Sequence, residues 1–386
     1  MINGPKTSMP KTTSMIAKGN NMMFAFLIAI LHLPRKIDEI NTFHHYTIEN
    51  RLVGVHMGRV LHVGPCNTPG GMAKVIEILS QNPPKEWSAE TFTSHIKGNV
   101  LNKILFHRKA ISMFNKLLNG EKKPDIVHIH TAADWSWKRK SNYVKICQNN
   151  SIPYVIHIHS GKFDQWLQKP NSKRSKAFKK LNNSQKCQVV VLTKTWKEKL
   201  QPMIGDCTTI GNPIDPTLEF KPDSLRKQNQ ILLLGRNDRV KGHQFAIKAC
   251  SELRSEKYPE LELVVTGTDI FTMPGVSSRE WVSEQEKKKL LQESSILIIP
   301  SGYEGQPMTM LESLQCGLTC IASDRILDIP KSVIQAKYED LADWKEKITH
   351  TLENPVDGKE LNDSIKHHSI EILNQLWKST YDGLLK

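Results

Sequence analysis

Two pairs of charged side chains stand out by their types and spacing. Arg236 and Lys241 follow one apolar run, and Glu304 and Glu312 follow another with seven residues between them. A guanidinium and an ammonium group can neutralise a diphosphate, arginine through a fork of donors and lysine as a point charge. Carboxylates instead accept hydrogen bonds from hydroxyls, such as those of a sugar ring. The four side chains together favour a ligand that carries both a diphosphate and hydroxyls.

Each pair lies at the end of a predicted strand. The strand-like run 230–236 (QILLLGR) precedes Lys241, and the run 295–301 (SILIIPS) precedes Glu304. Pro307 is well placed as the first residue of a helix that carries the second glutamate. Ligands of open parallel sheets bind at the carboxyl ends of strands, where helix starts favour phosphate. Any one of these charges alone is better explained as solvated surface, so the prediction of a site rests on their shared edge.

Apolar strands separated by helix-like stretches recur in two series. Such alternation indicates parallel pairing and doubly wound sheets. A chain of 386 residues also exceeds what one core usually holds, and proline and turn residues cluster at 212–222. We therefore expect two α/β domains with a linker near 213–228. The predicted strands are 59–63, 125–131, 153–160 and 187–193 in the first series, and 230–236, 261–267, 295–301 and 318–324 in the second.

The net charge of +14 is unevenly placed. Residues 57–215 carry 25 lysines and arginines against 10 acids, a balance of +15, whereas residues 216–386 carry 22 against 26. The hydrophobic and charged fractions, 39% and 24%, exclude a disordered chain, a collagen-like repeat and a polytopic membrane protein. The basic half favours an anionic partner: a nucleic acid, a membrane surface or a phosphorylated substrate. Nucleic acid is disfavoured because aromatic residues do not alternate with the basic ones.

Over roughly residues 58–380 the chain resembles the family 4 (group 1) retaining glycosyltransferases. Its second half has GR at 235–236, KG at 241–242, EGQPMTMLES at 304–313 and CGLTCIASD at 316–324. Its first half has RVLHVGPCNTPGGMAKV at 59–75, PDIVHIHTAADW at 124–135, YVIHIHSGKF at 154–163, VVVLTKTW at 189–196 and IGNPID at 210–215.

The resemblance implies the α/β fold called GT-B, in which two Rossmann-like doubly wound domains face a central cleft. The first domain would bind the acceptor and the second the nucleotide sugar, and a final helix would cross back to the first domain. The expected divisions are an N-terminal extension outside the fold at 1–57, the acceptor domain at 58–215, the nucleotide-sugar domain at 216–364 and the returning helix at 365–386.

The resemblance also implies roles for single residues. Arg236 and Lys241 would hold the donor diphosphate, Glu312 the ribose, and Glu304 with Gly305 the transferred sugar. The loop of Gly70 and Gly71 would contact phosphate or acceptor from across the cleft. The expected catalytic set is Arg236, Lys241, Glu304 and His159.

Two pairs of histidines alternate with apolar residues, so each pair points to one side of its strand. These are His128 with His130, and His157 with His159. Such imidazoles could ligate zinc, but no set of carboxylate and histidine follows at the other strand ends, so no metal is expected. We expect His128 and His157 to be buried and hydrogen-bonded. His159 matches the family's cleft histidine, and His130 and Asp134 are weaker candidates for the acceptor side.

The predicted function is metal-independent, retaining transfer of a sugar from a UDP- or GDP-sugar, which is a substrate, so no cofactor is expected. The acceptor would be a glycan or a polyprenyl-diphosphate-linked sugar in surface polysaccharide or glycoconjugate synthesis. The resemblance implies front-face substitution through an oxocarbenium-like transition state. Two alternatives stay open: a GT-B nucleotide-sugar epimerase or hydrolase, and a non-catalytic polyanion-binding protein.

A basic run suggests where the enzyme works. Residues 166–186 carry seven lysines and arginines and no acid, and Trp166, Leu167, Phe178 and Leu181 could supply an apolar side. We therefore predict peripheral attachment to the anionic cytoplasmic face of a membrane. The apolar segment 22–33 is too short to span a bilayer, which takes about 20 residues.

Overall fold

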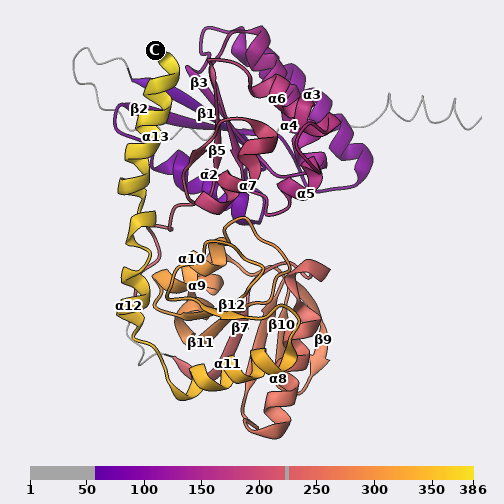
Figure 1. The fold of residues 1–386 in the computed structure, drawn as a ribbon, viewed down its shortest axis with the longest axis vertical. Coiled ribbons are helices and arrows are strands. Elements are labelled where there is room, and N and C mark those ends of the chain that lie inside the picture. The colour runs from indigo at the N-terminus through magenta and orange to yellow at the C-terminus, as the bar shows by residue number, and fades with distance from the viewer. Residues whose placement is uncertain (1–56, 222–225) are drawn as a thin grey trace, which may run out of the picture. The chain divides into compact units, whose positions relative to one another are not determined.

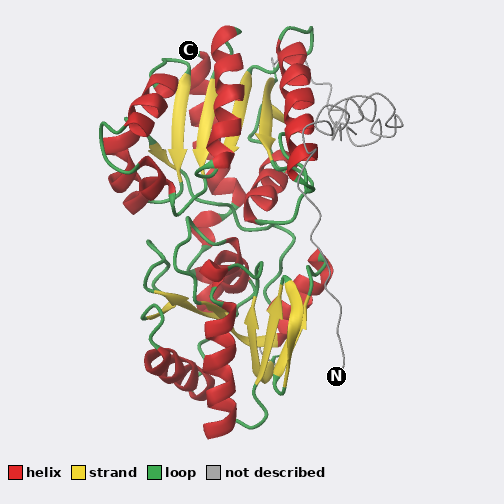
Figure 2. Cartoon of the chain, turned by 90° about the vertical axis from the view of Figure 1, so that its right-hand side faces the viewer, coloured by secondary structure: helices red, strands yellow, loops and turns green. Residues whose placement is uncertain are grey.

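The computed structural model describes residues 57–221 and 226–386, which belong to one compact unit. The predicted extension at residues 1–56 and the apolar segment 22–33 lie outside the described residues. Each half of the described chain builds one sheet with helices on both of its faces (Figures 1 and 2). We call the two halves the first lobe and the second lobe.

The sheet of the first lobe has the order β2-β1-β3-β4-β5-β6, and all its strand pairs are parallel. Four of its strands match the apolar runs of the sequence. The edge strand β2 was missed because its residues WSAETFT are half polar. The strands are β1 Gly58–Gly64, β2 Trp87–Thr93, β3 Ile126–Thr131, β4 Tyr154–Ile158, β5 Cys187–Val191 and β6 Thr208–Thr209.

Helices of the first lobe cover the sheet unequally. Helices α3 to α7 share a hydrophobic core with one face, whereas α2 packs on the other. The connections agree with a doubly wound sheet, because the chain leaves β1 for β2 on one side and returns to β3 on the other. The helices are α2 Gly71–Gln81, α3 Val100–Leu118, α4 Trp135–Asn149, α5 Phe163–Leu167, α6 Lys173–Asn182 and α7 Lys194–Ile204.

The second lobe has a seven-stranded sheet of order β13-β12-β11-β7-β8-β10-β9. Only the edge strand β9 runs antiparallel to its neighbour, in a hairpin with β10. This hairpin was not predicted, because its exposed residues lack an apolar run. The strands are β7 Lys227–Leu233, β8 Glu262–Thr266, β9 Thr268–Met273, β10 Val276–Arg279, β11 Ser294–Ile299, β12 Thr319–Ser323 and β13 Ile334–Ala336.

Two separate cores hold the second lobe together. Helices α9, α10 and α12 pack on one face of the sheet, and α8 and α11 on the other. Burial of leucine, isoleucine and valine from the strands supplies most of the apolar area, each side chain contributing about 1.5–3 kcal/mol. The helices are α8 His243–Glu256, α9 Glu284–Glu293, α10 Met308–Gln315, α11 Leu341–Glu353 and α12 Gly358–Asp363.

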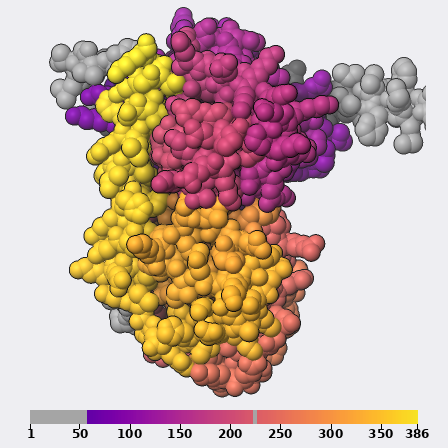
Figure 3. All heavy atoms as spheres, viewed as in Figure 1, coloured from indigo at the N-terminus to yellow at the C-terminus, as the bar shows by residue number. Residues whose placement is uncertain are grey.

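The last helix, α13 Ile370–Leu385, returns to the first lobe (yellow in Figures 1 and 3). Trp377 and Tyr381 pack with Trp87 in the core that α2 covers, and the Trp87 indole donates a hydrogen bond to Asp382 at 3.0 Å. Leu376 of this helix does not join the core, because its side chain is 45% exposed. Tyr381 fills the buried stripe instead.

Among the described residues, no helix is both long and apolar enough to cross a membrane.

Candidate active site

The second sheet reverses its strand order between β7 and β11. The chain continues from β7 to β8 on one side, whereas β11 pairs with β7 on the other. Ligands of doubly wound sheets bind in the crevice outside such a reversal, at the carboxyl ends of the strands. Arg236 and Lys241 follow β7, and Glu304 follows β11. The residues predicted from spacing therefore surround the point at which this topology places a ligand.

Lys241 and Glu304 form an ion pair. Lys241 ends the short 3-10 helix Arg239–Lys241, and its Nζ lies 2.5 Å from Glu304 Oε1. The next residue, Gly242, has φ 74°, and a Cβ there would lie 2.9 Å from the Pro300 carbonyl. This glycine therefore lets the Lys241 turn approach the end of β11. Arg236 is exposed at the same strand end and forms no side-chain hydrogen bond or ion pair with the described residues.

Glu312 is held by a lysine that the sequence analysis missed. It lies in α10, is 2% exposed, and its Oε1 is 2.8 Å from the Nζ of Lys287 in α9. Lys287 also lies 2.8 Å from Glu284. Burial works against the charged lysine, but the two carboxylates outweigh it and raise the Lys287 pKa. The buried glutamate thus stays in place with its second oxygen free of hydrogen bonds to the described protein.

A second lysine that was not predicted from the sequence, Lys74, forms ion pairs that link the first lobe to the second. Lys74 in α2 lies 2.8 Å from Asp215 and 3.6 Å from Glu284. Its pKa is raised, because burial is outweighed by the hydrogen bond and charge of Asp215. Lys74 and Asp215 both fall inside quoted motifs, GGMAKV and IGNPID, so the sequence held a signal for them. Lys287 had none.

Strand-end loops of the first lobe contact the loop 300–307 of the second. A Cβ on Gly161 would overlap the backbone of Glu304, and a Cβ on Gly305 would overlap the carbonyl of His159. The indole of Trp196 donates a hydrogen bond to the Gly305 carbonyl at 3.0 Å. The carboxyl edges of the two sheets therefore meet backbone to backbone, which only glycine permits at these positions.

The glycine loop after β1 also reaches the second lobe. A Cβ on Gly71 would lie 3.4 Å from the Met308 side chain at the start of α10, whereas one on Gly70 would meet nothing within 4 Å. Gly70 has φ 138°, a conformation that side chains rarely adopt. Asp134, the weak acceptor-side candidate, is exposed before α4 with φ 56°. These three residues follow β1 and β3 at the carboxyl edge of the first sheet, and their role on the acceptor side stays a prediction.

Five histidines form two hydrogen-bonded groups inside the first lobe. His62 Nδ1 lies 3.0 Å from His130 Nε2, and His130 Nδ1 lies 2.9 Å from His159 Nε2. In the second group, His128 bonds Tyr381 at 2.8 Å and His157 at 3.2 Å. His128 and His157 are buried and bonded, as predicted. His130 is 0% exposed and stands behind His159, not at the surface.

Burial keeps these imidazoles neutral. It lowers the pKa of His62 and of His159 to about 3, and that of His128, His130 and His157 well below the ordinary value. A neutral row has one N–H per ring, so the tautomer of each ring fixes that of the next. Whether Nδ1 of His159 is a hydrogen-bond donor or an acceptor is therefore determined by the tautomers of His130 and His62.

Two histidine triads bring one ring nitrogen each within 4.8 Å of the others: His62, His128 and His130, and His130, His157 and His159. These are residues that could hold a metal. Most of the nitrogens bond one another or Tyr381, whereas Nε2 of His157 is buried without a hydrogen-bond partner among the described residues.

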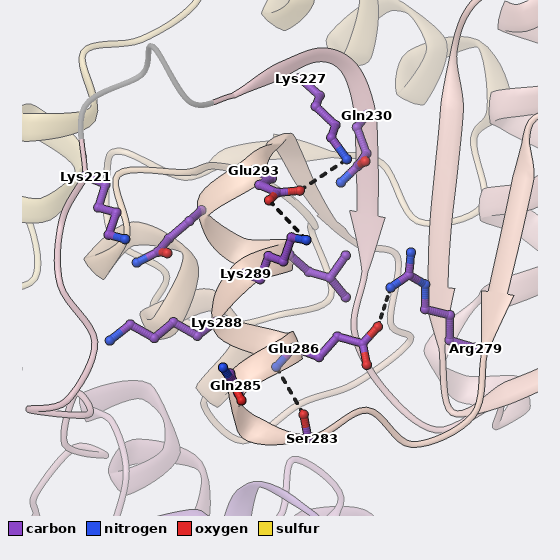
Figure 4. Close-up of a pocket in the computed structure, with 12 residues that line it drawn as sticks. Lys221, Lys227, Gln230, Arg279, Ser283, Gln285, Glu286, Lys288, Lys289 and Glu293 are labelled. Carbon is purple, nitrogen blue, oxygen red and sulfur yellow. Dashed lines mark hydrogen bonds and ion pairs between the residues drawn. The ribbon is translucent and has the colours of Figure 1, made fainter.

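A surface pocket of about 510 Å³ lies apart from this edge, beside α9 and the strands β7 and β10 (Figure 4). Its two acids are paired, Glu293 with Lys227 and Lys289, and Glu286 with Arg279, whereas Lys221 and Lys288 leave the pocket with an excess of positive charge. None of the predicted site residues lines it. The edge between β7 and β11 is therefore the better candidate for the active site.

Comparisons with known proteins identify the second lobe directly. Residues 215–368 match the family of glycosyl transferases group 1. No curated protein matches the chain in sequence.

Solved structures match the fold over both lobes. Sucrose-phosphate synthase from Thermosynechococcus elongatus has a TM-score of 0.65 at 14% identity, over 85% of this chain and 99% of that one. TarM has a TM-score of 0.61 at 12% identity, over 84% and 99%. The pneumococcal O-GlcNAc transferase GtfA, in complex with UDP and GlcNAc, has a TM-score of 0.56 at 15% identity. The match covers 72% of this chain and 60% of that one. The fold of two Rossmann-like lobes, together with the family of residues 215–368, confirms the resemblance predicted from the motifs: the second lobe is a group 1 glycosyltransferase domain, and the two lobes together have the GT-B fold.

Proposed function

We propose that this glycosyltransferase moves a sugar from a UDP- or GDP-sugar to a polyprenyl-diphosphate-linked acceptor at the cytoplasmic face of a membrane, with retention at the anomeric carbon. Transfer from a nucleotide sugar is the activity of its family. The observation that carries the donor assignment is the placement of two lysine–glutamate pairs, Lys241 with Glu304 and Lys287 with Glu312, beside the strand-order reversal.

Each pair combines fixed geometry with spare hydrogen-bonding capacity. An ammonium has three donors, so Lys241 can keep Glu304 in place and still bind a departing diphosphate. Arg236, which has no protein partner among the described residues, supplies a second cation from the same strand end. Positive groups that are already in place stabilise the transition state, because negative charge builds up on the leaving diphosphate. Removing one such donor lowers kcat by about 10²–10³.

The two glutamates would orient hydroxyls. The free oxygen of Glu312 suits the ribose, and the half-buried Glu304 suits the transferred sugar. Retention then follows from front-face attack, in which the leaving phosphate takes the proton of the acceptor hydroxyl. His159 lies in the loop that contacts Gly305, and its Nδ1, which forms no hydrogen bond with the described residues, would bond the sugar.

Nucleotide choice is the first point to test. GtfA, which shares the fold, was solved with UDP, and this favours a uridine nucleotide. We expect a UDP-sugar or a GDP-sugar, and no ADP-sugar, to raise the thermal midpoint, since a ligand at 100 times its Kd stabilises by about 2.7 kcal/mol. Release of nucleotide should require a lipid-linked acceptor. Equal release without acceptor would instead indicate a hydrolase or an epimerase.

The basic face of the first lobe supports membrane attachment. Helix α3 packs beside α4, and α4 beside α6, on one face of the sheet. Lys173, Lys176 and Lys180 of α6 are exposed, whereas Arg174 and Lys179 are engaged with the carbonyls of Trp166 and Pro202. Each basic residue near an anionic leaflet contributes about 1 kcal/mol.

The apolar side expected for residues 166–186 is not available for insertion. Leu167 and Phe178 are fully buried in the core of the lobe. Helix α3 offers the apolar surface instead, with Val100, Leu101, Ile104 and Leu105 exposed by 71, 62, 51 and 60%. We call these four residues the α3 patch. Arg108 and Lys109 of the same helix are exposed and add charge.

Co-sedimentation with vesicles tests the attachment. Binding to anionic vesicles should be strong at low salt and weaken steeply at higher ionic strength, because the Debye length is about 10 Å at 0.1 M. Replacing Leu101 and Leu105 with Ser, or Lys173, Lys176 and Lys180 with Ser, should reduce it. Ile270→Ser, at an exposed apolar residue of β9, is the matched control and should have no effect. Equal binding to neutral and anionic vesicles would contradict the proposal and favour a soluble acceptor.

A further inference from the structure

Lys140 is a buried cation without a partner. It lies in the second turn of α4 and is 1% exposed, yet its ammonium has no hydrogen bond or ion pair with any described residue. Buried charges are normally paired, because removing an ion from water is costly unless an opposite charge compensates. A chain that keeps such a group at this position gains nothing in stability from it, which points to a ligand.

Unpaired polar groups surround the same helix. Arg139 forms no ion pair with the described residues, and its buried Nε has no hydrogen-bond partner. The Tyr143 hydroxyl, one turn along α4, and His107 Nδ1 of α3 are also buried without partners. The rings of His107 and Tyr143 are 6.0 Å apart. Buried polar groups are nearly always satisfied in folded proteins, so several together indicate a missing partner.

The cluster lies at the carboxyl edge of the first sheet. The charge of Lys140 acts on Cys66, in the loop after β1, and on His95, in the loop after β2. Arg139 acts on His95 and on His107. Burial lowers the pKa of Lys140 to about 7, with repulsion by Arg139 adding to the effect. The glycine loop and His159 border the same edge, so the cluster lies on the acceptor side of the active site.

The chemistry of the cluster fits an anion. Arg139 and Lys140 are cations and the Tyr143 hydroxyl can donate, whereas no carboxylate among the described residues pairs with either cation. An arginine fork with a lysine point charge is the usual recognition of phosphate. We propose that Arg139 and Lys140, flanked by His95, bind a phosphate group carried by the acceptor. This inference rests on the proposed glycosyl transfer for the identity of the ligand as acceptor.

Titration of the full-length protein with inorganic phosphate tests the site. The measurement uses a Lys241→Ala background, which weakens phosphate binding at the donor side. Lys140→Met should weaken phosphate binding by about tenfold or more, as expected for a lost hydrogen bond to a charged group. Lys138→Met, at an exposed lysine of the same helix, is the matched control and should change the affinity less than about twofold.

The thermal midpoint separates a binding role from a structural one. Methionine removes an unpaired buried charge, so Lys140→Met should leave the midpoint unchanged or raise it while phosphate binding is lost. Arg139→Gln provides a second loss of binding should the first variant fold poorly. Phosphate affinity that survives both substitutions, or that falls equally in Lys138→Met, would overturn the proposal. Because inorganic phosphate needs no nucleotide sugar, these results do not depend on whether transfer occurs.

Two further ligands, farnesyl phosphate and glucose 1-phosphate, distinguish a lipid phosphate from a soluble one. Helix α3, which supplies His107, also carries the α3 patch, so a lipid phosphate would gain apolar contact there. Farnesyl phosphate that binds more tightly than glucose 1-phosphate, with the gain removed by Leu101→Ser, would support the site and assign a lipid. Equal binding of the two would support the site with a soluble phosphorylated acceptor. Binding of neither would contradict it.

Discussion

The Nζ of Lys241 lies 2.5 Å from Oε1 of Glu304, although 62 residues separate them in the chain. The two strands that precede them, β7 and β11, are neighbours in the sheet, and this adjacency brings the side chains together. The pair places a cation and a hydroxyl acceptor side by side at the edge where the two lobes meet.

Replacing Lys241 with Ala should lower kcat by about a hundredfold to a thousandfold, because the lost charge acts most strongly as the diphosphate leaves. The thermal midpoint should change little. Lys248→Ala, at an exposed lysine on the helix that follows, is the control and should retain full turnover. Near-normal kcat in the Lys241 variant at saturating donor would remove this residue from the site.

Glu312→Ala should affect both stability and donor binding. It leaves Lys287 buried with only Glu284, so we expect a loss of about 3 kcal/mol in the free energy of unfolding. The donor KM should rise with less effect on kcat. The double variant Glu312→Ala, Lys287→Met separates the two effects: it should recover most of the stability, as urea unfolding would measure, but not the KM. Recovery of both would show that Glu312 only supports the fold.

Gly161→Ala should damage activity more than stability. Its Cβ would overlap the Glu304 backbone, so the loop 300–307 must move away from the first lobe. We expect kcat/KM to fall at least about tenfold, since small displacements of catalytic groups are costly. Gly383→Ala, in α13 with nothing near its Cβ, is the control and should be neutral or slightly stabilising. Unchanged activity in Gly161→Ala would show that this contact is not needed for catalysis.

The sequence predicted the parts of the fold that apolar runs encode. Strands β3, β4, β5, β8 and β12 lie within the predicted ranges, and β11 begins one residue before its predicted range, because these strands are buried on both faces. The edge strand β2 and the hairpin of β9 and β10 were not predicted, because exposed strands need no continuous apolar run.

The site was predictable where it depends on strand ends. Arg236, Lys241 and Glu304 follow neighbouring strands, so their clustering follows from topology. The pairing of Lys287 with Glu312 could not be foreseen, because it joins the faces of two helices whose rotation depends on packing. The histidine row depends on strand register: His62 pairs with His128, and His130 with His157. Sequence alternation gave the side of each strand but not this register.

Activity should survive EDTA. The edge proposed to bind the donor carries Arg236 and Lys241, which can carry out the charge neutralisation that a metal provides elsewhere, and the sequence has no Asp-x-Asp pair at a strand end. Transfer rates measured before and after dialysis against EDTA should agree within about twofold. A complete loss that Zn²⁺ or Mn²⁺ restores would instead indicate that one of the histidine triads binds a metal.

The five hydrogen-bonded histidines of the first lobe, four of them buried and His159 half-buried, should make the protein sensitive to acid. An unfolded chain protonates each histidine below about pH 6.5, whereas the folded protein protonates His62 and His159 only near pH 3. Between these values the unfolded state binds more protons, so the free energy of unfolding should fall as pH falls, by about 1.4 kcal/mol per pH unit for each histidine. Urea unfolding at pH 7.5, 6.5 and 5.5 measures this slope. His130→Gln should reduce the slope by about one proton's share, whatever its effect on absolute stability, because one titrating ring is removed from the row. A free energy of unfolding that is constant over this range would mean that these imidazoles are protonated in the folded protein and that the neutral row does not exist.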